Sequence, residues 1–136
     1  MRLQWAGLSM KDETRRWLEY AEENLKSSQV LFESNLYNPC LQNVQQSIEK
    51  ALKSLLVEHS IKVLKSHSIS EIVGLLNQHN IRIDISKEDC ELFDSVYLPS
   101  KYPLMSVLPD FIPDKAVCHK CILIAENVFK SVQKLL

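Results

Sequence analysis

The central stretch of the chain, residues 38–58, constrains the fold more strongly than any other feature. Its apolar side chains recur every three or four positions, which is the period of an amphipathic α-helix. The apolar stripe consists of Leu41, Val44, Ile48, Ala51 and Leu55. The opposite side carries Gln42, Gln46, Glu49, Lys50 and Lys53. We therefore predict one long helix with a buried apolar face and a polar face in water.

Four other segments show the same period, so the chain is predicted to form an all-α fold. The expected helices span about residues 11–34, 68–80, 86–97 and 114–136, the second of them fraying from residue 77. Only two glycines occur in 136 residues, whereas β-folds with many tight turns need more. Such helices bury their apolar faces as an antiparallel bundle, here of four to five helices. A chain of this length is most simply one domain over residues 1–136.

Several residues are predicted to mark where the helices begin. Asn38 is a suitable N-cap, and Pro39 is a suitable first helical residue because its fixed φ is already helical. Ser68 and Glu71 have the spacing of a capping box, in which side chains satisfy free backbone N–H groups. Ser86 stands three residues before Asp89 in the same way, and it is predicted to mark the start of the fourth helix.

Two of the segments between the helices have distinctive patterns. Residues 81–85 alternate like a strand, but no second strand is evident, so we predict an extended connector. Residues 98–113 contain four of the five prolines, and this density is predicted to prevent a continuous helix. We expect this segment to form the longest loop, and long loops in compact domains often carry function.

The overall charge and the terminal residues exclude some classes of protein. The formal net charge is −1 and the isoelectric point is near 6.4, which argues against a strongly basic nucleic-acid binder. A local basic groove remains compatible with this average. No apolar run approaches the roughly 18 residues of a membrane span, and the first residues lack the pattern of a signal peptide. We therefore expect a cytoplasmic protein, with no membrane association and with its four cysteines reduced.

The polar face of the central helix has two interpretations. Glu49 and Lys53 stand four residues apart in the orientation that favours an ion pair, so the face can be an ordinary solvated one. Alternatively it recognises a ligand. Lys50 and Lys53 then hold a phosphate between two ammonium groups, and the amide of Gln46 reads a base edge or caps a partner helix.

His67 stands just before the third predicted helix and is the second candidate. In one interpretation its side chain only satisfies backbone groups near the helix start. In the other it faces a cleft beside the central helix, where an imidazole can accept or donate a proton near neutral pH. The residue pattern assigns no carboxylate partner to it.

The segment Cys118-His119-Lys120-Cys121 raises the question of a metal site. A structural zinc site needs four ligands, usually with a second pair elsewhere. The remaining thiols, Cys40 and Cys90, are isolated in the sequence, and Cys121 fits the apolar stripe of the last helix. We predict that Cys118 and Cys121 pack in or beside the core, and that the protein holds no metal and no other cofactor.

Four short motifs together resemble the HEPN domain family. Residues 45–56 read Gln-Gln-x-x-Glu-Lys-x-Leu-Lys-x-Leu-Leu, and residues 65–69 read Lys-Ser-His-Ser-Ile. Trp17 and Ala21 resemble the opening Trp-x-x-x-Ala helix of the family. Residues 97–103 resemble its Tyr-x-x-x-Arg-Tyr-Pro loop, with Lys101 in place of the arginine and Tyr102 as the second tyrosine. The resemblance extends over residues 17–132.

The resemblance implies a fold and a range of activities. It implies a bundle like the substrate-binding domain of nucleotidyltransferases, frequently a homodimer, with a link to nucleotides. Some members accompany a small separate nucleotidyltransferase, and others are RNA-cleaving toxins of prokaryotic toxin–antitoxin pairs. The ribonucleases carry an arginine, four to six residues and then a histidine, and none of the four arginines of this chain is followed by a histidine at that spacing.

We therefore predict a non-catalytic homodimer that binds a nucleotide or a separate nucleotidyltransferase. At position 101, lysine keeps the positive charge of the family's arginine but lacks the planar guanidinium that binds two phosphate oxygens. The candidate site residues are Gln46, Glu49, Lys50, Lys53, His67, Lys101 and Tyr102. One alternative is a ribonuclease with a degenerate motif, in which Lys101 or Lys62 replaces the arginine and His67 is the general base. The other alternative is a purely structural protein-interaction module.

Overall fold

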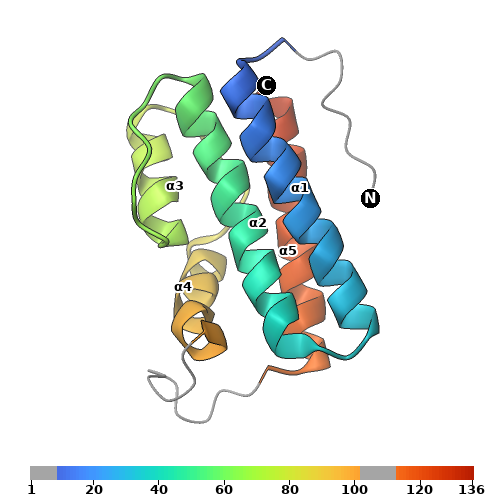
Figure 1. The fold of residues 1–136 in the computed structure, drawn as a ribbon. Coiled ribbons are helices and arrows are strands. Elements are labelled where there is room, and N and C mark those ends of the chain that lie inside the picture. Colours follow the sequence, from blue (N-terminus) through green and yellow to red (C-terminus); the bar gives the residue numbers. More distant parts are fainter. Residues whose placement is uncertain (1–8, 102–112) are drawn as a thin grey trace.

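Five α-helices make up the fold in Figure 1, a computed structural model that describes residues 9–101, with the backbone alone over 96–101, and residues 113–136. The helices are α1 (Asp12–Glu33), α2 (Tyr37–Glu58), α3 (Ile69–Gln78), α4 (Lys87–Lys101) and α5 (Lys115–Lys134). No strand occurs in these two ranges, and the prediction of an all-α fold is confirmed. Within the same ranges, no helix has the length and apolar character needed to span a membrane.

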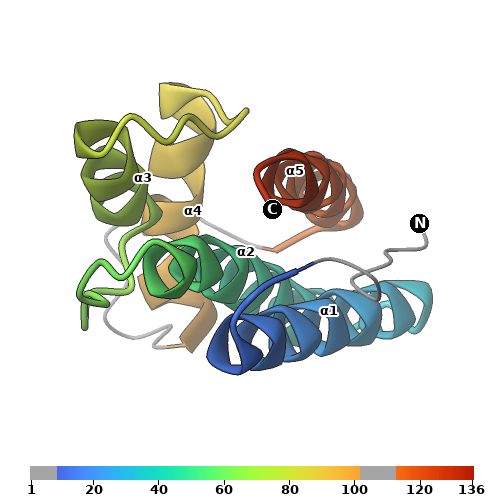
Figure 2. The same cartoon turned by 90° about the horizontal axis from the view of Figure 1, so that it is seen from above.

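Helix α2 is the central element, and it contacts each of the other four helices. The three longest helices, α1, α2 and α5, run side by side, while α3 and α4 lie on the other side of α2 (Figures 1 and 2). The predicted apolar stripe of α2 is buried, and so are most of its remaining side chains. A helix surrounded in this way has little surface left for water.

The prediction of a solvated polar face on α2 is wrong for part of that face. Of the residues predicted on that face, Glu49 is 9% exposed and Lys53 5%, and the adjacent Gln45 is 2% exposed. The connector between α2 and α3 covers them, since apolar residues of this connector pack against the core and its His67 carbonyl accepts a hydrogen bond from Gln45. The helical period shows which side chains share a face, but it does not show what a distant segment will cover.

Most predicted helix starts are confirmed. The Ser68 Oγ accepts a hydrogen bond from the Glu71 backbone N–H at 3.2 Å, and Ser86 Oγ accepts one from the Asp89 N–H at 3.0 Å. The prediction for α2 is wrong, because this helix begins at Tyr37 and makes Pro39 its third residue. Proline is tolerated there because the first N–H groups of a helix have no intrahelical acceptor.

The start of α1 is satisfied by the end of α2. The Glu58 carboxylate accepts hydrogen bonds from the Lys11 backbone N–H at 3.1 Å and from the Thr14 hydroxyl at 2.9 Å. The bond from the Lys11 N–H is the main cause that lowers the pKa of Glu58. In return the Lys11 ammonium donates to the Val57 carbonyl at 3.0 Å, near the end of α2. The two antiparallel helices thus satisfy each other's free terminal groups.

The segments on either side of α4 give one confirmation and one correction. Residues 81–85 form no strand; Ile81 is 7% exposed, and Ile83 and Ile85 pack against the core. The prediction that a loop begins at residue 98 is wrong, because α4 continues through Pro99 to Lys101. The rest of the predicted loop, residues 102–112, lies outside the described residues. Proline removes one helical hydrogen bond, but its φ of about −65° is itself helical, so a helix can pass through it.

Candidate functional site

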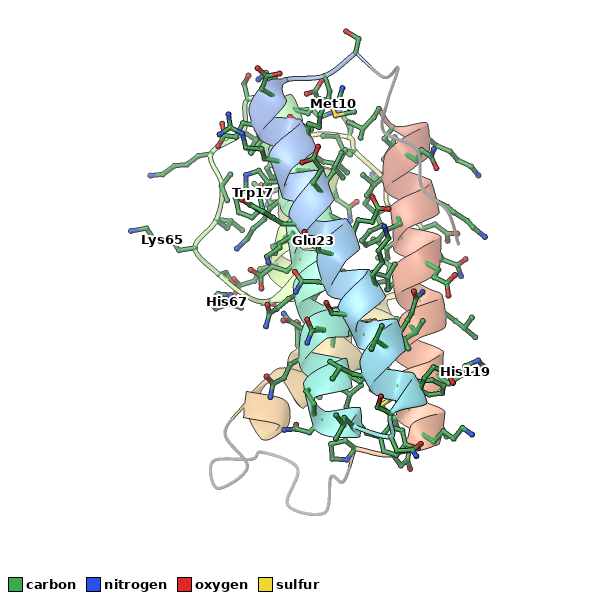
Figure 3. All side chains as sticks on the ribbon, turned by 45° about the vertical axis from the view of Figure 1, so that its right-hand side comes forward. Met10, Trp17, Glu23, Lys65, His67 and His119 are labelled. Atoms are coloured by element: carbon green, nitrogen blue, oxygen red, sulfur yellow. The ribbon has the colours of Figure 1, made fainter. Side chains whose placement is uncertain are left out.

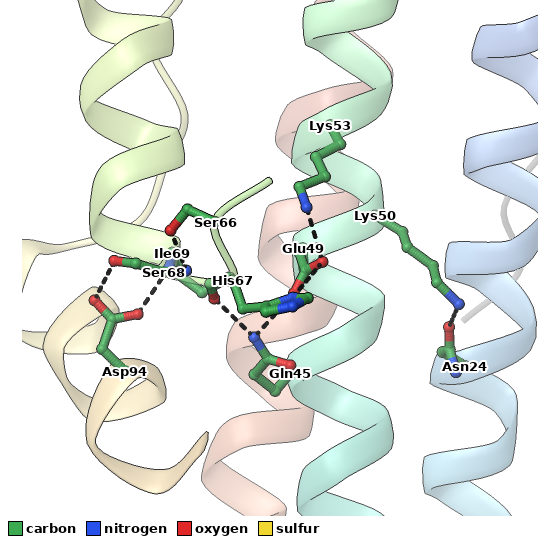
Figure 4. A network of polar contacts seen from close by, with 10 residues as sticks. All are labelled: Asn24, Gln45, Glu49, Lys50, Lys53, Ser66, His67, Ser68, Ile69 and Asp94. Carbon is green, nitrogen blue, oxygen red and sulfur yellow. Dashed lines mark hydrogen bonds and ion pairs between the residues drawn. The ribbon is translucent and has the colours of Figure 1, made fainter. Parts of the chain in front are cut away.

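The Glu49 carboxylate is the centre of a polar network between α2 and the connector (Figure 4). The Lys53 ammonium donates to its Oε2 at 3.0 Å, and Nδ1 of His67 lies 3.0 Å from its Oε1. The Gln45 amide donates to the same Oε1 at 3.3 Å and to the His67 carbonyl at 3.1 Å. One buried carboxylate therefore joins a buried lysine, a buried amide and a histidine that the sequence places 18 residues away.

The position of His67 suits proton transfer as well as binding. A carboxylate at Nδ1 fixes the orientation of an imidazole. The His67 side chain is 56% exposed, so it reaches solvent from the edge of a buried network. The carboxylate partner that the sequence did not assign is Glu49. No local signal indicated it, because the contact depends on the path of the connector.

Asp94 of α4 holds the residues that follow His67. Its carboxylate accepts hydrogen bonds from the Ser68 hydroxyl at 3.0 Å and from the backbone N–H groups of Ile69 at 2.7 Å and Ser70 at 3.3 Å. A carboxylate at a helix N-terminus is favourable, because free N–H groups point at it and the helix dipole is positive there. Asp94 thereby anchors the end of the connector that carries His67 (Figure 4).

The two predicted phosphate-binding lysines of α2 have different partners. Lys53 points to Glu49, whereas the Lys50 ammonium donates to Asn24 of α1 at 2.7 Å and lies 5.9 Å from the centroid of the Tyr20 ring. The described side chains therefore do not form the clamp of two adjacent ammonium groups that we expected. Gln46, also on α2, is half-buried.

The last two predicted site residues cannot be located in the same way. Lys101 is the final residue of α4, and its side chain lies outside the described part of the structure. Tyr102 also lies outside the described residues. Their predicted contact with a ligand stays a prediction.

A cavity of about 380 Å³ lies where α1 meets Lys50. We call it the aromatic pocket, and it is lined by Glu13, Arg16, Trp17, Tyr20 and Lys50. Tyr20 is 57% exposed, so much of its ring is accessible to a ligand. Trp17 lies on the same side of the molecule as Lys65 and His67 (Figure 3).

This pocket was not predicted from the sequence, where Trp17 was considered only as part of a family motif. The buried face of α1 is built from Thr14, Leu18, Ala21, Leu25 and Ser28, and Trp17 is half-buried beside it. A signal was present in the sequence. Residues 13, 16, 17 and 20 recur at helical spacing, so two aromatic rings and a guanidinium necessarily share one face.

The cysteine segment has the structural role that we predicted. Cys118 and Cys121 are fully buried, and desolvation raises the pKa of each thiol to about 12. His119 is exposed, and its ring centroid lies 6.0 Å from that of Phe32, outside the core (Figure 3). In the part of the chain that the structure describes, no three or more His, Cys, Asp and Glu residues come together as metal ligands.

The fold and the motifs agree with one known family. The profile of the HEPN domain matches residues 14–135. The chain belongs to the HEPN domain family. The match includes α2, the connector with His67, and the aromatic pocket except for Glu13.

Two solved structures are similar to this HEPN domain. The crystal structure of TT1696 from Thermus thermophilus has a TM-score of 0.78 and 24% identity, with 93% of this chain and 100% of that chain covered. The crystal structure of ST0689, an archaeal HEPN homologue, has a TM-score of 0.67 and 23% identity, with 90% and 96% covered. At these identities the likeness supports the fold. Comparison with curated proteins finds no match.

Proposed function

We propose that this HEPN domain binds a nucleotide in the aromatic pocket and does not itself transform it. The observation that carries the proposal is the composition of the pocket: two aromatic rings and two cations line one cavity. A nucleotide has the complementary parts, namely a flat base and a negatively charged phosphate.

The aromatic side chains account for recognition of the base. Stacking of a base on an aromatic ring contributes about 1–3 kcal/mol and tolerates any base, because every base has a π-face. Trp17 and Tyr20 lie one helical turn apart on α1, and a cavity of about 380 Å³ is within the range of small-molecule sites. The side chain of Glu13 in the same cavity can accept hydrogen bonds from a base or a ribose.

The cations account for recognition of the phosphate. An ammonium group has three donors, and Lys50 uses one of them on the neutral Asn24 amide. Within residues 9–95 and 113–136, neither Lys50 nor Arg16 forms an ion pair with a carboxylate. Both charges are therefore available to an anionic ligand, whereas the charge of Lys53 is already balanced by Glu49.

Binding of this kind does not by itself give catalysis. Only interactions that strengthen in the transition state accelerate a reaction. Among the described residues that line the pocket, Glu13 is the one carboxylate that could transfer a proton. The predicted homodimer and the predicted nucleotidyltransferase partner are both compatible with a binding role. Light scattering of the purified protein, alone and with nucleotide, tests the oligomeric part of the proposal.

Replacing Lys50 with glutamine is expected to weaken nucleotide binding by about tenfold. The reason is that a hydrogen bond to a charged group contributes about 1.5–3 kcal/mol, and about 1.4 kcal/mol corresponds to a tenfold change in affinity. The chain has two tryptophans, so a Trp5→Phe background leaves Trp17 as the reporter. Quenching of Trp17 fluorescence during titration with ATP, GTP and AMP measures the affinity.

The matched control for this measurement is Lys26→Gln. Lys26 is also on the surface, and its side chain is 69% exposed and paired with Glu22. The control is expected to keep the affinity of the parent protein. An unquenched Trp17 at millimolar nucleotide contradicts the proposal and favours the structural alternative, in which the aromatic pocket contacts another protein.

A second candidate function is RNA cleavage, favoured by the His67–Glu49 hydrogen bond. An imidazole oriented by a carboxylate is the arrangement of a general base. Under this hypothesis the purified protein cleaves a mixed-sequence RNA, and His67→Ala abolishes the cleavage. Intact RNA after prolonged incubation at high protein concentration removes this candidate and leaves the binding role.

A further inference from the structure

A second cavity, of about 450 Å³, lies between α5 and the connector that joins α3 to α4. We call it the basic pocket, and it is lined by Arg82, Ile83, Asp84, Asn127, Lys130, Ser131 and Lys134. It shares no residue with the aromatic pocket. In Figure 2 this connector runs toward α5.

The walls of the basic pocket are held in place by specific contacts. The Asp84 backbone N–H donates to the Ser131 hydroxyl oxygen at 3.0 Å, which joins residues 47 apart in the sequence. Ile81 and Ile83 anchor the connector in the core. On α5, the lining residues stand at positions 127, 130, 131 and 134, so they share one helical face. The two walls therefore face each other across a defined space.

The charges of the basic pocket are unbalanced. Three cations and one carboxylate line it, and among the described residues none of the three cations forms an ion pair. Lys130 and Lys134 are one helical turn apart, where like charges repel. The negative end of the α5 dipole stabilises the positive charge of Lys134 near the C-terminus of the helix. The dipole does not explain the presence of Arg82, which belongs to the connector between α3 and α4.

We propose that the basic pocket binds the phosphate groups of a polyphosphate chain or of an RNA strand. The Arg82 guanidinium offers a planar fork of donors that matches two phosphate oxygens, and the two lysines add point charges. The Ser131 oxygen accepts from the Asp84 N–H, so its own hydrogen can point to a ligand. The single carboxylate leaves an excess of positive charge that a phosphate compensates.

The test uses inorganic tripolyphosphate, which carries phosphates but no base that could stack in the aromatic pocket. Isothermal titration of the full chain at low ionic strength measures its affinity. The double variant Lys130→Gln/Lys134→Gln is expected to weaken binding by about tenfold or more, because charge-assisted hydrogen bonds are lost. Circular dichroism verifies that the variant is folded.

The matched control is Lys115→Gln/Lys120→Gln, which removes two exposed lysines and the same charge from the other end of α5. It is expected to bind tripolyphosphate as the parent protein does. An equal loss in this control, or the absence of binding by the parent protein at millimolar tripolyphosphate, overturns the proposal. Loss of binding in Lys50→Gln also overturns it, since the anion then occupies the aromatic pocket.

A competition arm identifies the source of the phosphate. Displacement of tripolyphosphate by a short single-stranded RNA, lost in Lys130→Gln/Lys134→Gln, supports the proposal with an RNA strand as the ligand. Binding of tripolyphosphate that RNA does not displace supports it with a free polyphosphate chain. The proposal does not depend on the nucleotide site, because the basic pocket and the aromatic pocket have separate variants and separate readouts.

Discussion

Replacing Glu49 with leucine is expected to lower the free energy of unfolding by about 3–5 kcal/mol, the cost of leaving one member of a buried ion pair alone. Lys53 is 5% exposed, and its ammonium lies 3.0 Å from the Glu49 carboxylate. Without that carboxylate a charge remains in the protein interior. Urea denaturation followed by circular dichroism measures the loss.

Two controls show whether the stability lost in Glu49→Leu comes from the buried charge of Lys53 or only from the loss of a side chain. Glu22→Leu breaks the pair with Lys26, which has the same spacing of four residues and in which the lysine is 69% and the glutamate 20% exposed. This change is expected to cost at most about 1 kcal/mol. The double variant Glu49→Leu/Lys53→Leu is expected to recover much of the stability lost in Glu49→Leu, because apolar replacements of a buried pair are often neutral. A double variant less stable than Glu49→Leu contradicts this explanation.

Replacing Asp94 with alanine is expected to cost about 2–3 kcal/mol, since hydrogen bonds to charged groups are strong and the loss of a helix cap alone costs up to about 2 kcal/mol. The variant loses the acceptor of Ser68, Ile69 and Ser70 at the start of α3. Chemical denaturation measures the stability, and amide hydrogen exchange of α3 locates the loss.

The conservative variant Asp94→Asn distinguishes shape from charge. It keeps one acceptor oxygen in place but has no negative charge to interact with the α3 dipole, so an intermediate stability is expected. Because the same carboxylate anchors the connector, Asp94→Ala is also expected to increase hydrogen exchange at His67. Unchanged exchange at both α3 and His67 excludes this role for Asp94.

The helices themselves were largely predictable from local patterns. The apolar stripe through Ile48 is buried as expected, and the Ser68 and Ser86 caps form as their spacing indicated. The start of α2 and the end of α4 were predicted incorrectly at prolines. Each proline removes one backbone N–H donor and brings its ring against the preceding turn, so its effect depends on its position in the helix.

The candidate site was predictable only in part. Glu49, Lys50, Lys53 and His67 were named as candidates from the sequence, but their partners in the fold were not. Glu49 and Lys53 are buried because the connector folds over one side of α2, and Lys50 turns instead toward Asn24. These contacts depend on the relative placement of segments that are far apart in the chain.

The all-α class, the approximate helices and their apolar faces follow from local sequence patterns, since helical periodicity and capping are properties of a few consecutive residues. Which polar side chains are buried, and which cations remain unpaired among the described residues, depends on how the helices and connectors pack. This packing pairs His67 with Glu49, and it brings Trp17 and Tyr20 beside Lys50 and Arg82 beside Lys130. The physical reason is that burial and charge balance are set by the segment that covers a residue, and that segment is distant in the sequence.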